Sequence, residues 1–123
     1  MALAPQVFGC DPLDRTEHAA RGKGVTVAYS WVSGPPAVGE LATLRLRLCD
    51  ISGAPAGGKL SVDAVMPAHG HGMNYTPPTV EVADEPVAVT GLLFHMPGRW
   101  QLRFKLRGDG VTRRAHADFL LAH

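Results

Sequence analysis

The sequence predicts an all-β domain, an immunoglobulin-like β-sandwich of about seven strands, from three observations. Short runs with alternating apolar and polar side chains recur along the chain, turn residues separate them, and only one short helical segment is indicated. The 123 residues include 14 glycines and 10 prolines, and 46% of all residues are hydrophobic and 19% charged. This composition is typical of one globular domain with a single core.

The predicted elements follow one another in a simple order. Residues 1–23 form an irregular N-terminal segment, apart from one or two helical turns over 14–21, and the sandwich occupies residues 24–123. The sequence G-D-G at 108–110 predicts a tight hairpin turn between the last two strands. The predicted strands cover residues 25–31, 44–48, 60–66, 79–83, 87–96, 100–107 and 115–121.

Charge and hydropathy exclude two classes of partner. The formal net charge is +1, which gives no electrostatic reason to expect nucleic acid as a partner. No apolar run approaches the ~20 residues that span a bilayer, so we expect no transmembrane segment. Basic residues at alternate positions, such as Arg103, Lys105 and Arg107, are expected on a solvated face of a strand.

The chain has two cysteines, Cys10 and Cys49, and they do not form a C-x-x-C pair. Their separation predicts a disulfide that ties the N-terminal segment to a strand, and hence a periplasmic or other extracytoplasmic location. Two unpaired buried thiols are the alternative. Residues 7–10, V-F-G-C, also resemble a lipoprotein cleavage box, so a lipid anchor on the precursor is a further hypothesis.

The chemically distinctive segment is 66–73, M-P-A-H-G-H-G-M. His69, His71 and Met73 alternate with glycines, and the ligands of one metal must approach within about 4 Å of one another. Alternate residues of a straight strand are ~7 Å apart, so the chain must curl here, as Gly70 and Gly72 permit. Imidazole binds several metals, whereas thioether sulfur selects Cu(I). The segment therefore predicts a copper site that favours Cu(I), with Cu(II) as a second bound state.

A second histidine–methionine pair, His95 and Met96, ends a later predicted strand. Because loops at one end of a sandwich cluster in space, this pair is expected to face the first segment. Met66 shares the parity of the apolar residues of its strand, so it is either a core residue or an additional ligand. The alternative to a metal site is a glycine-rich turn with incidental histidines, in a metal-free interaction or structural module.

No enzymatic activity is predicted. The sequence contains neither the G-x-S-x-G motif of a serine hydrolase nor paired carboxylates in a cleft pattern. Methionine is a poor ligand for a hydrolytic zinc ion, which disfavours a metallohydrolase. A copper redox enzyme is disfavoured as well, because Cys49 lies outside the histidine–methionine motif.

The motif at 66–73, followed by M-P-G-R-W at 96–100 and an alternating strand, resembles the YtkA-like/FixH-like family of small extracytoplasmic domains. The resemblance covers residues 40–122. It implies an immunoglobulin-like sandwich and a role in copper handling or in the assembly of copper-containing oxidases. By position it makes His69, His71 and Met73 the loop ligands, with Met96 facing them. The implied protein is a periplasmic copper chaperone or carrier, whose partner is a copper-receiving oxidase or another metallochaperone.

Overall fold

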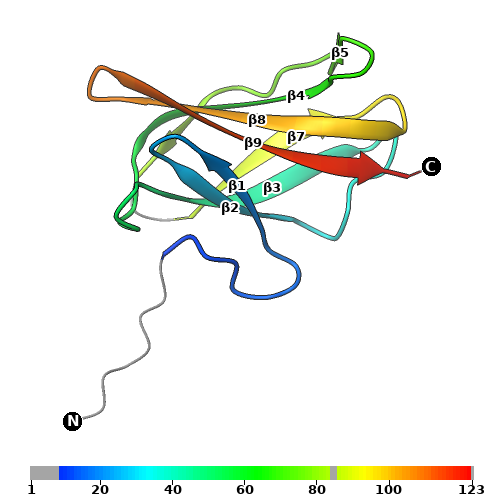
Figure 1. Cartoon of the computed structure of the whole chain (residues 1–123). Coiled ribbons are helices and arrows are strands. Elements are labelled where there is room, and N and C mark those ends of the chain that lie inside the picture. The colour runs from blue at the N-terminus through cyan, green and yellow to red at the C-terminus, as the bar shows by residue number, and fades with distance from the viewer. Residues whose placement is uncertain (1–8, 84–85, 123) are drawn as a thin grey trace.

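The computed structural model describes residues 9–83 and 86–122, which form nine β-strands in one antiparallel sheet (Figure 1). The order across the sheet is β5-β4-β8-β9-β1-β2-β3-β7, and β6 also pairs with β4. The predicted all-β class is confirmed. The strands are β1 (His18–Gly22), β2 (Thr26–Trp31), β3 (Leu41–Cys49), β4 (Gly58–Met66), β5 (His71–Gly72), β6 (Val80–Val82), β7 (Val87–Leu93), β8 (Gly98–Gly108) and β9 (Val111–Leu121).

The sheet curls so that its two halves pack face to face as a sandwich (Figure 1). Aromatic contacts join the halves: Tyr29 of β2 meets Phe104 of β8 at 5.7 Å between ring centroids, and Trp31 meets Phe119 of β9 at 5.5 Å. The core between them is built by strict alternation, which the register of a half-buried strand demands. In β8, for example, alternate residues from Trp100 to Leu106 are buried.

All seven predicted strands are present, and two short strands were not predicted. The helix expected over 14–21 is wrong, because residues 18–22 form β1, between β9 and β2. The segment 1–23 is therefore not irregular throughout, although its first eight residues lie outside the described part of the chain. The predicted hairpin turn is confirmed: Gly108 pairs with Val111, and Asp109 and Gly110 have φ of 52° and 73°. Two positive φ values are typical of a type I′ turn.

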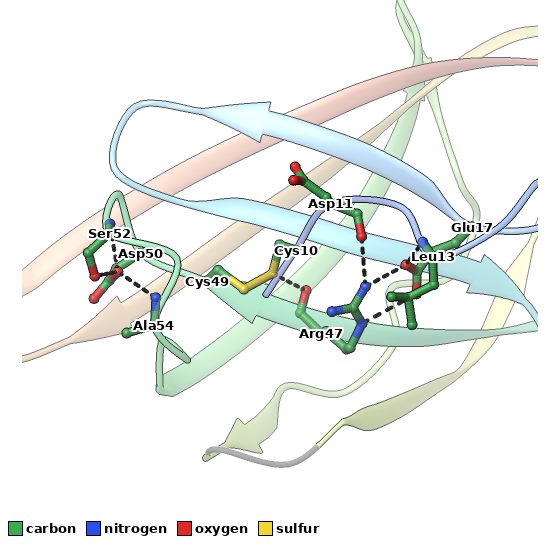
Figure 2. The surroundings of a disulfide bond; sticks show 9 residues. All are labelled: Cys10, Asp11, Leu13, Glu17, Arg47, Cys49, Asp50, Ser52 and Ala54. Carbon is green, nitrogen blue, oxygen red and sulfur yellow. Dashed lines mark hydrogen bonds and ion pairs between the residues drawn. A yellow bond between two sulfur atoms is a disulfide. The ribbon is translucent and has the colours of Figure 1, made fainter. Parts of the chain in front are cut away.

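The predicted disulfide between Cys10 and Cys49 is present, with a Cα–Cα distance of 5.8 Å (Figure 2). Both cysteines are buried and pack with Ala28 of β2. Because Ala28 lies between the core-facing residues Val27 and Tyr29, it points to the outer face of its layer. The disulfide thus holds the N-terminal segment against the outside of the β1-β2-β3 layer.

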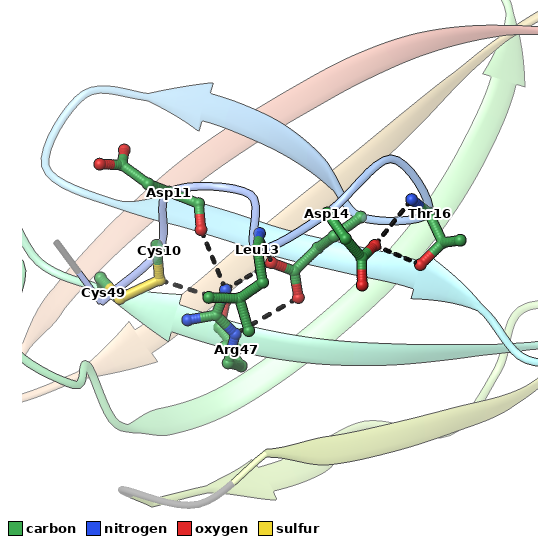
Figure 3. Close-up of polar contacts among 8 residues, drawn as sticks. Cys10, Asp11, Leu13, Asp14, Thr16, Arg47 and Cys49 are labelled. Atoms are coloured by element: carbon green, nitrogen blue, oxygen red, sulfur yellow. Dashed lines mark hydrogen bonds and ion pairs between the residues drawn. A yellow bond between two sulfur atoms is a disulfide. The ribbon is translucent and has the colours of Figure 1, made fainter. Parts of the chain in front are cut away.

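Arg47 of β3 fastens the same segment by polar contacts (Figure 3). Its guanidinium forms an ion pair with Glu17 and donates a hydrogen bond to the carbonyl oxygen of Asp11 at 3.2 Å. Glu17 also accepts a hydrogen bond from the backbone N–H of Leu13 at 3.0 Å. Residues 9–17, which we call the N-terminal strap, therefore pack on this outer face and neutralise Arg47.

Tyr29 makes the stability of the sandwich depend on pH in the alkaline range. Burial, and to a lesser extent the nearby Asp118 carboxylate, raises the pKa of the Tyr29 phenol from 10.0 to about 12. Since the folded pKa lies above the unfolded one, the neutral phenol stabilises the fold fully below pH 10, and this contribution is lost as the pH rises toward about 12. Urea denaturation should therefore show a steeper loss of stability over this interval in the wild type than in Tyr29→Phe. Equal slopes would contradict the assignment.

Candidate functional site

The distinctive segment 66–73 forms a hairpin between β4 and β5. The carbonyl oxygen of Met66 accepts hydrogen bonds from the backbone N–H groups of His69 at 3.1 Å and Gly70 at 2.9 Å. Gly70 has a φ of +66°, a left-handed conformation that glycine adopts without steric cost. The chain then returns along β4, with His71 opposite Met66. The expected curl is present, and Gly70 makes it; Gly72 lies in β5 without a positive φ.

The two imidazoles of the hairpin lie side by side in solvent. His69 and His71 are both exposed, and their ring centroids are 6.2 Å apart with an interplanar angle of 35°. Two imidazoles that share one metal at metal–nitrogen distances of about 2.0 Å have ring centroids within roughly 6.4 Å of each other. The observed separation of 6.2 Å falls within this limit. The turn that separates the two residues in sequence brings them together.

The two methionines of the segment lie on the inner face of the hairpin. Directly opposite residues of an antiparallel pair, and alternate residues of one strand, share a face, so His71, Met66 and Met73 point the same way. Met66 is 2% exposed and packs in the core, as the parity of its strand indicated. Met73 is half-buried against the same core. The thioether of Met73 is thus the more accessible of the two.

The second predicted pair lies in the connection from β7 to β8. Met96 is half-buried against the core, and its carbonyl oxygen accepts a hydrogen bond from Trp100 Nε1 at 2.9 Å. The His95 ring stands edge-on to Trp100, with 5.8 Å between centroids. His95 Nδ1 is buried and has no hydrogen-bond partner among the described residues. An unpaired buried nitrogen costs about 1–3 kcal/mol, so a ligand that paired it would be bound favourably.

The two segments meet through Met66. A Cβ on Gly98 would lie 2.8 Å from Met66 Cε, so the absence of a side chain at Gly98 admits the methionine. Since β4 and β8 pair in register with Val65 opposite Gln101, the end of β4 and the start of β8 lie together. All six predicted ligands are therefore at one end of the sandwich. The hairpin histidines contact each other, whereas His95 contacts Trp100 instead.

Thioethers would have to complete any metal site here. In the described parts of the chain, no three side chains from among His, Cys, Asp and Glu come together as metal ligands do. The imidazole pair of His69 and His71 would accordingly need methionine sulfur as its further protein ligand, and Met73 is the nearest in sequence. Such a donor set is neutral and soft, which suits Cu(I) better than zinc.

Trp100 organises this end of the molecule, and the sequence indicated it as a strand residue and as the last residue of the M-P-G-R-W motif, but not as a contact of His95 and Met96. It is fully buried, and it contacts both members of the His95–Met96 pair. Its hydrogen bond to the Met96 carbonyl oxygen has no local signal in the sequence, because it depends on how the β7–β8 connection packs.

Comparison of the chain with protein-family models, with curated proteins and with solved structures yields no match.

Within residues 9–83 and 86–122, no helix has the length and apolar character needed to cross a membrane.

Proposed function

We propose that this protein binds copper, with a preference for Cu(I), through His69, His71 and Met73, and passes it to a partner protein. One observation carries the proposal: the two exposed imidazoles stand 6.2 Å apart on a hairpin whose inner face also presents a thioether. The resemblance of the segments 66–73 and 96–100 to YtkA-like/FixH-like domains supports the same residues.

The chemistry of the donors favours transfer over permanent retention. Imidazole and thioether are neutral, so they stabilise a monovalent ion by covalency more than by charge. Thioethers also resist the oxidative pairing that thiols undergo in a disulfide-forming compartment. The hairpin is exposed, and a partner's ligands can therefore reach an ion held there before it is released. These features together describe a periplasmic copper chaperone or carrier.

The buried groups beside the hairpin are proposed as supporting ligands. Met96 and His95 approach from the β7–β8 connection, and a metal would pair the orphan Nδ1 of His95. Met66 fills the core beneath Gly98, so it would have to leave its packed position to ligate. We therefore assign the primary site to the hairpin. The receiving partner is proposed to be a copper oxidase or another metallochaperone.

Cu(I) titration against a chromogenic chelator tests the proposal. The variant His69→Ala/His71→Ala/Met73→Ala is expected to lose at least ~100-fold in Cu(I) affinity, because even changes around the ligands cost 10–100-fold. The control is His18→Ala/His116→Ala, which removes two exposed histidines outside the hairpin and should leave the affinity unchanged.

A thermal melt gives an independent measurement. One equivalent of Cu(I) should raise the melting temperature of the wild type, since a ligand that binds only the folded state stabilises it. Unchanged affinity in the triple variant, or a melting temperature indifferent to copper, would contradict copper binding. Either result would favour the metal-free interaction module.

A further inference from the structure

A groove of about 560 Å³ runs over the outer face of β4, β8 and β9. Because the outward side chains of these strands alternate with the core residues, they form its walls and floor. Three of them, Arg103, Lys105 and Arg114, are cationic. The lining includes Asp63, Thr76, Arg103, Lys105, Arg114 and His116.

Strand register concentrates the cations of the groove. Lys105 lies directly opposite Arg114, and Arg103 lies directly opposite His116. Neighbouring strands are about 4.8 Å apart, and alternate residues of one strand about 7 Å, so the charges of Arg103, Lys105 and Arg114 form a compact group. Like charges placed directly opposite destabilise a sheet. Such a cost is offset when an anion binds between them.

Among the described residues, no carboxylate forms an ion pair with this group. The one ion pair in the described part of the chain joins Arg47 to Glu17, on the other layer of the sandwich. Arg103 instead donates a hydrogen bond to the neutral amide of Gln101 at 2.9 Å. Asp63, opposite Arg103 on β4, accepts a hydrogen bond from the backbone N–H of Ala64 at 2.8 Å.

The two outer faces of the sandwich thus differ. The N-terminal strap packs on the β1-β2-β3 face and pairs its Arg47, as Figures 2 and 3 show. The β4-β8-β9 face has no such cover from the described residues, and its cations line a hollow. A surface with a concentrated charge and a concave shape favours a complementary, oppositely charged partner.

We propose that this groove docks a carboxylate-rich segment of a partner protein. An extended acidic segment presents alternate side chains at the same ~7 Å repeat as Arg103 and Lys105, so successive carboxylates meet successive cations. Thr76, on the wall of the groove, follows Met73 by three residues, which places a docked partner beside the hairpin. If the hairpin carries copper as proposed above, the docked protein is the one that exchanges copper with it.

The same face is poorly suited to nucleic acid or to a lipid surface. Single-stranded nucleic acids stack their bases on aromatic side chains, whereas Phe104 and Trp100 of β8 are buried on the inner face. Peripheral membrane binding uses an apolar surface that inserts between lipids, whereas the outward side chains that line the groove are polar or charged.

Fluorescence anisotropy with a fluorescein-labelled hexaglutamate peptide and metal-free protein tests the proposal. Wild-type protein should bind the peptide at low salt, with an affinity that falls as salt screens the charges. The variant Arg103→Glu/Lys105→Glu/Arg114→Glu should bind at least ~10-fold more weakly. The matched control, Arg15→Glu/Lys23→Glu/Arg45→Glu, changes the net charge equally at exposed positions outside the groove and should change the affinity less than ~3-fold.

Several outcomes would overturn the docking site. These are no peptide binding by the wild type, an equal loss in both charge-reversal variants, or tighter binding of hexathymidylate or phosphatidylserine vesicles than of hexaglutamate. If the charge reversals unfold the protein, the glutamine versions at the same three positions replace them. The copper-site variant should bind hexaglutamate as the wild type does, so failure of the copper proposal and failure of the docking proposal are separately visible.

Discussion

Replacing Trp100 with alanine is expected to lower the free energy of unfolding by about 3–5 kcal/mol, the usual cost of removing a large aromatic side chain from a core. Trp100 is fully buried and meets Phe94 edge-on at 5.1 Å between ring centroids. Its indole also holds the carbonyl of Met96 and the ring of His95. Urea denaturation monitored by far-UV circular dichroism measures the loss, independently of the indole's own fluorescence.

The variant Trp100→Phe separates packing from hydrogen bonding. It retains much of the aromatic volume but removes the Nε1 donor to Met96, so we expect a smaller loss, of about 1–3 kcal/mol. A cost below about 1 kcal/mol for Trp100→Ala would be inconsistent with a place at the centre of the core. Equal losses in the two variants would mean that the hydrogen bond, and not packing, dominates.

The sequence was informative wherever a strand is long and one of its faces is buried. In β3 and β8 every second residue meets the opposite layer, so the chemical alternation along the chain records the structure directly. The two strands that were not predicted, β1 and β5, lack this alternation. In β1, Ala20 is the one buried residue, and β5 has two residues, both exposed. Pairing with neighbouring strands defines both, and that pairing is not visible in a local pattern.

In the candidate site, too, features set by local chain geometry could be predicted, whereas features set by long-range contacts could not. The curl at Gly70 and the proximity of His69 to His71 follow from local chain geometry, and both could be predicted. The inward position of Met66 agrees with the parity of its strand, but the space that admits its side chain is left by Gly98, which is distant in sequence. The unpaired His95 Nδ1 depends likewise on how the β7–β8 connection packs on Trp100. Such long-range contacts need the folded structure.

The basic groove was only half predictable, for a related reason. The alternation of Arg103 and Lys105 indicated that both lie on one face of a strand, and they do. Their expected role as a solvated face did not include Arg114 and His116, which lie opposite them on β9. Register between strands brings the four residues together. A sequence with alternating basic residues therefore predicts a face, and the fold decides whether that face becomes a binding groove.

The second large effect is expected at the disulfide. Replacing both cysteines, as in Cys10→Ser/Cys49→Ser, should lower the free energy of unfolding by about 4 kcal/mol in the chain-entropy model, since the bond closes a loop with a sequence separation of 39. The loss has a local component as well, because the buried cysteines pack on Ala28 and fix the strap that carries Glu17. Thermal melts with and without a reductant measure it.

The response to reductant separates the covalent contribution from the polar one. Reduction should lower the melting temperature of the wild type toward that of the double serine variant, whose own melting temperature should not respond. Arg47→Gln breaks the ion pair with Glu17 but keeps the disulfide, and it should cost only about 1 kcal/mol, because both side chains remain partly exposed to solvent. A wild type indifferent to reductant would contradict the covalent strap. A loss in Arg47→Gln as large as that in the double serine variant would instead assign the stability of the strap to its charges.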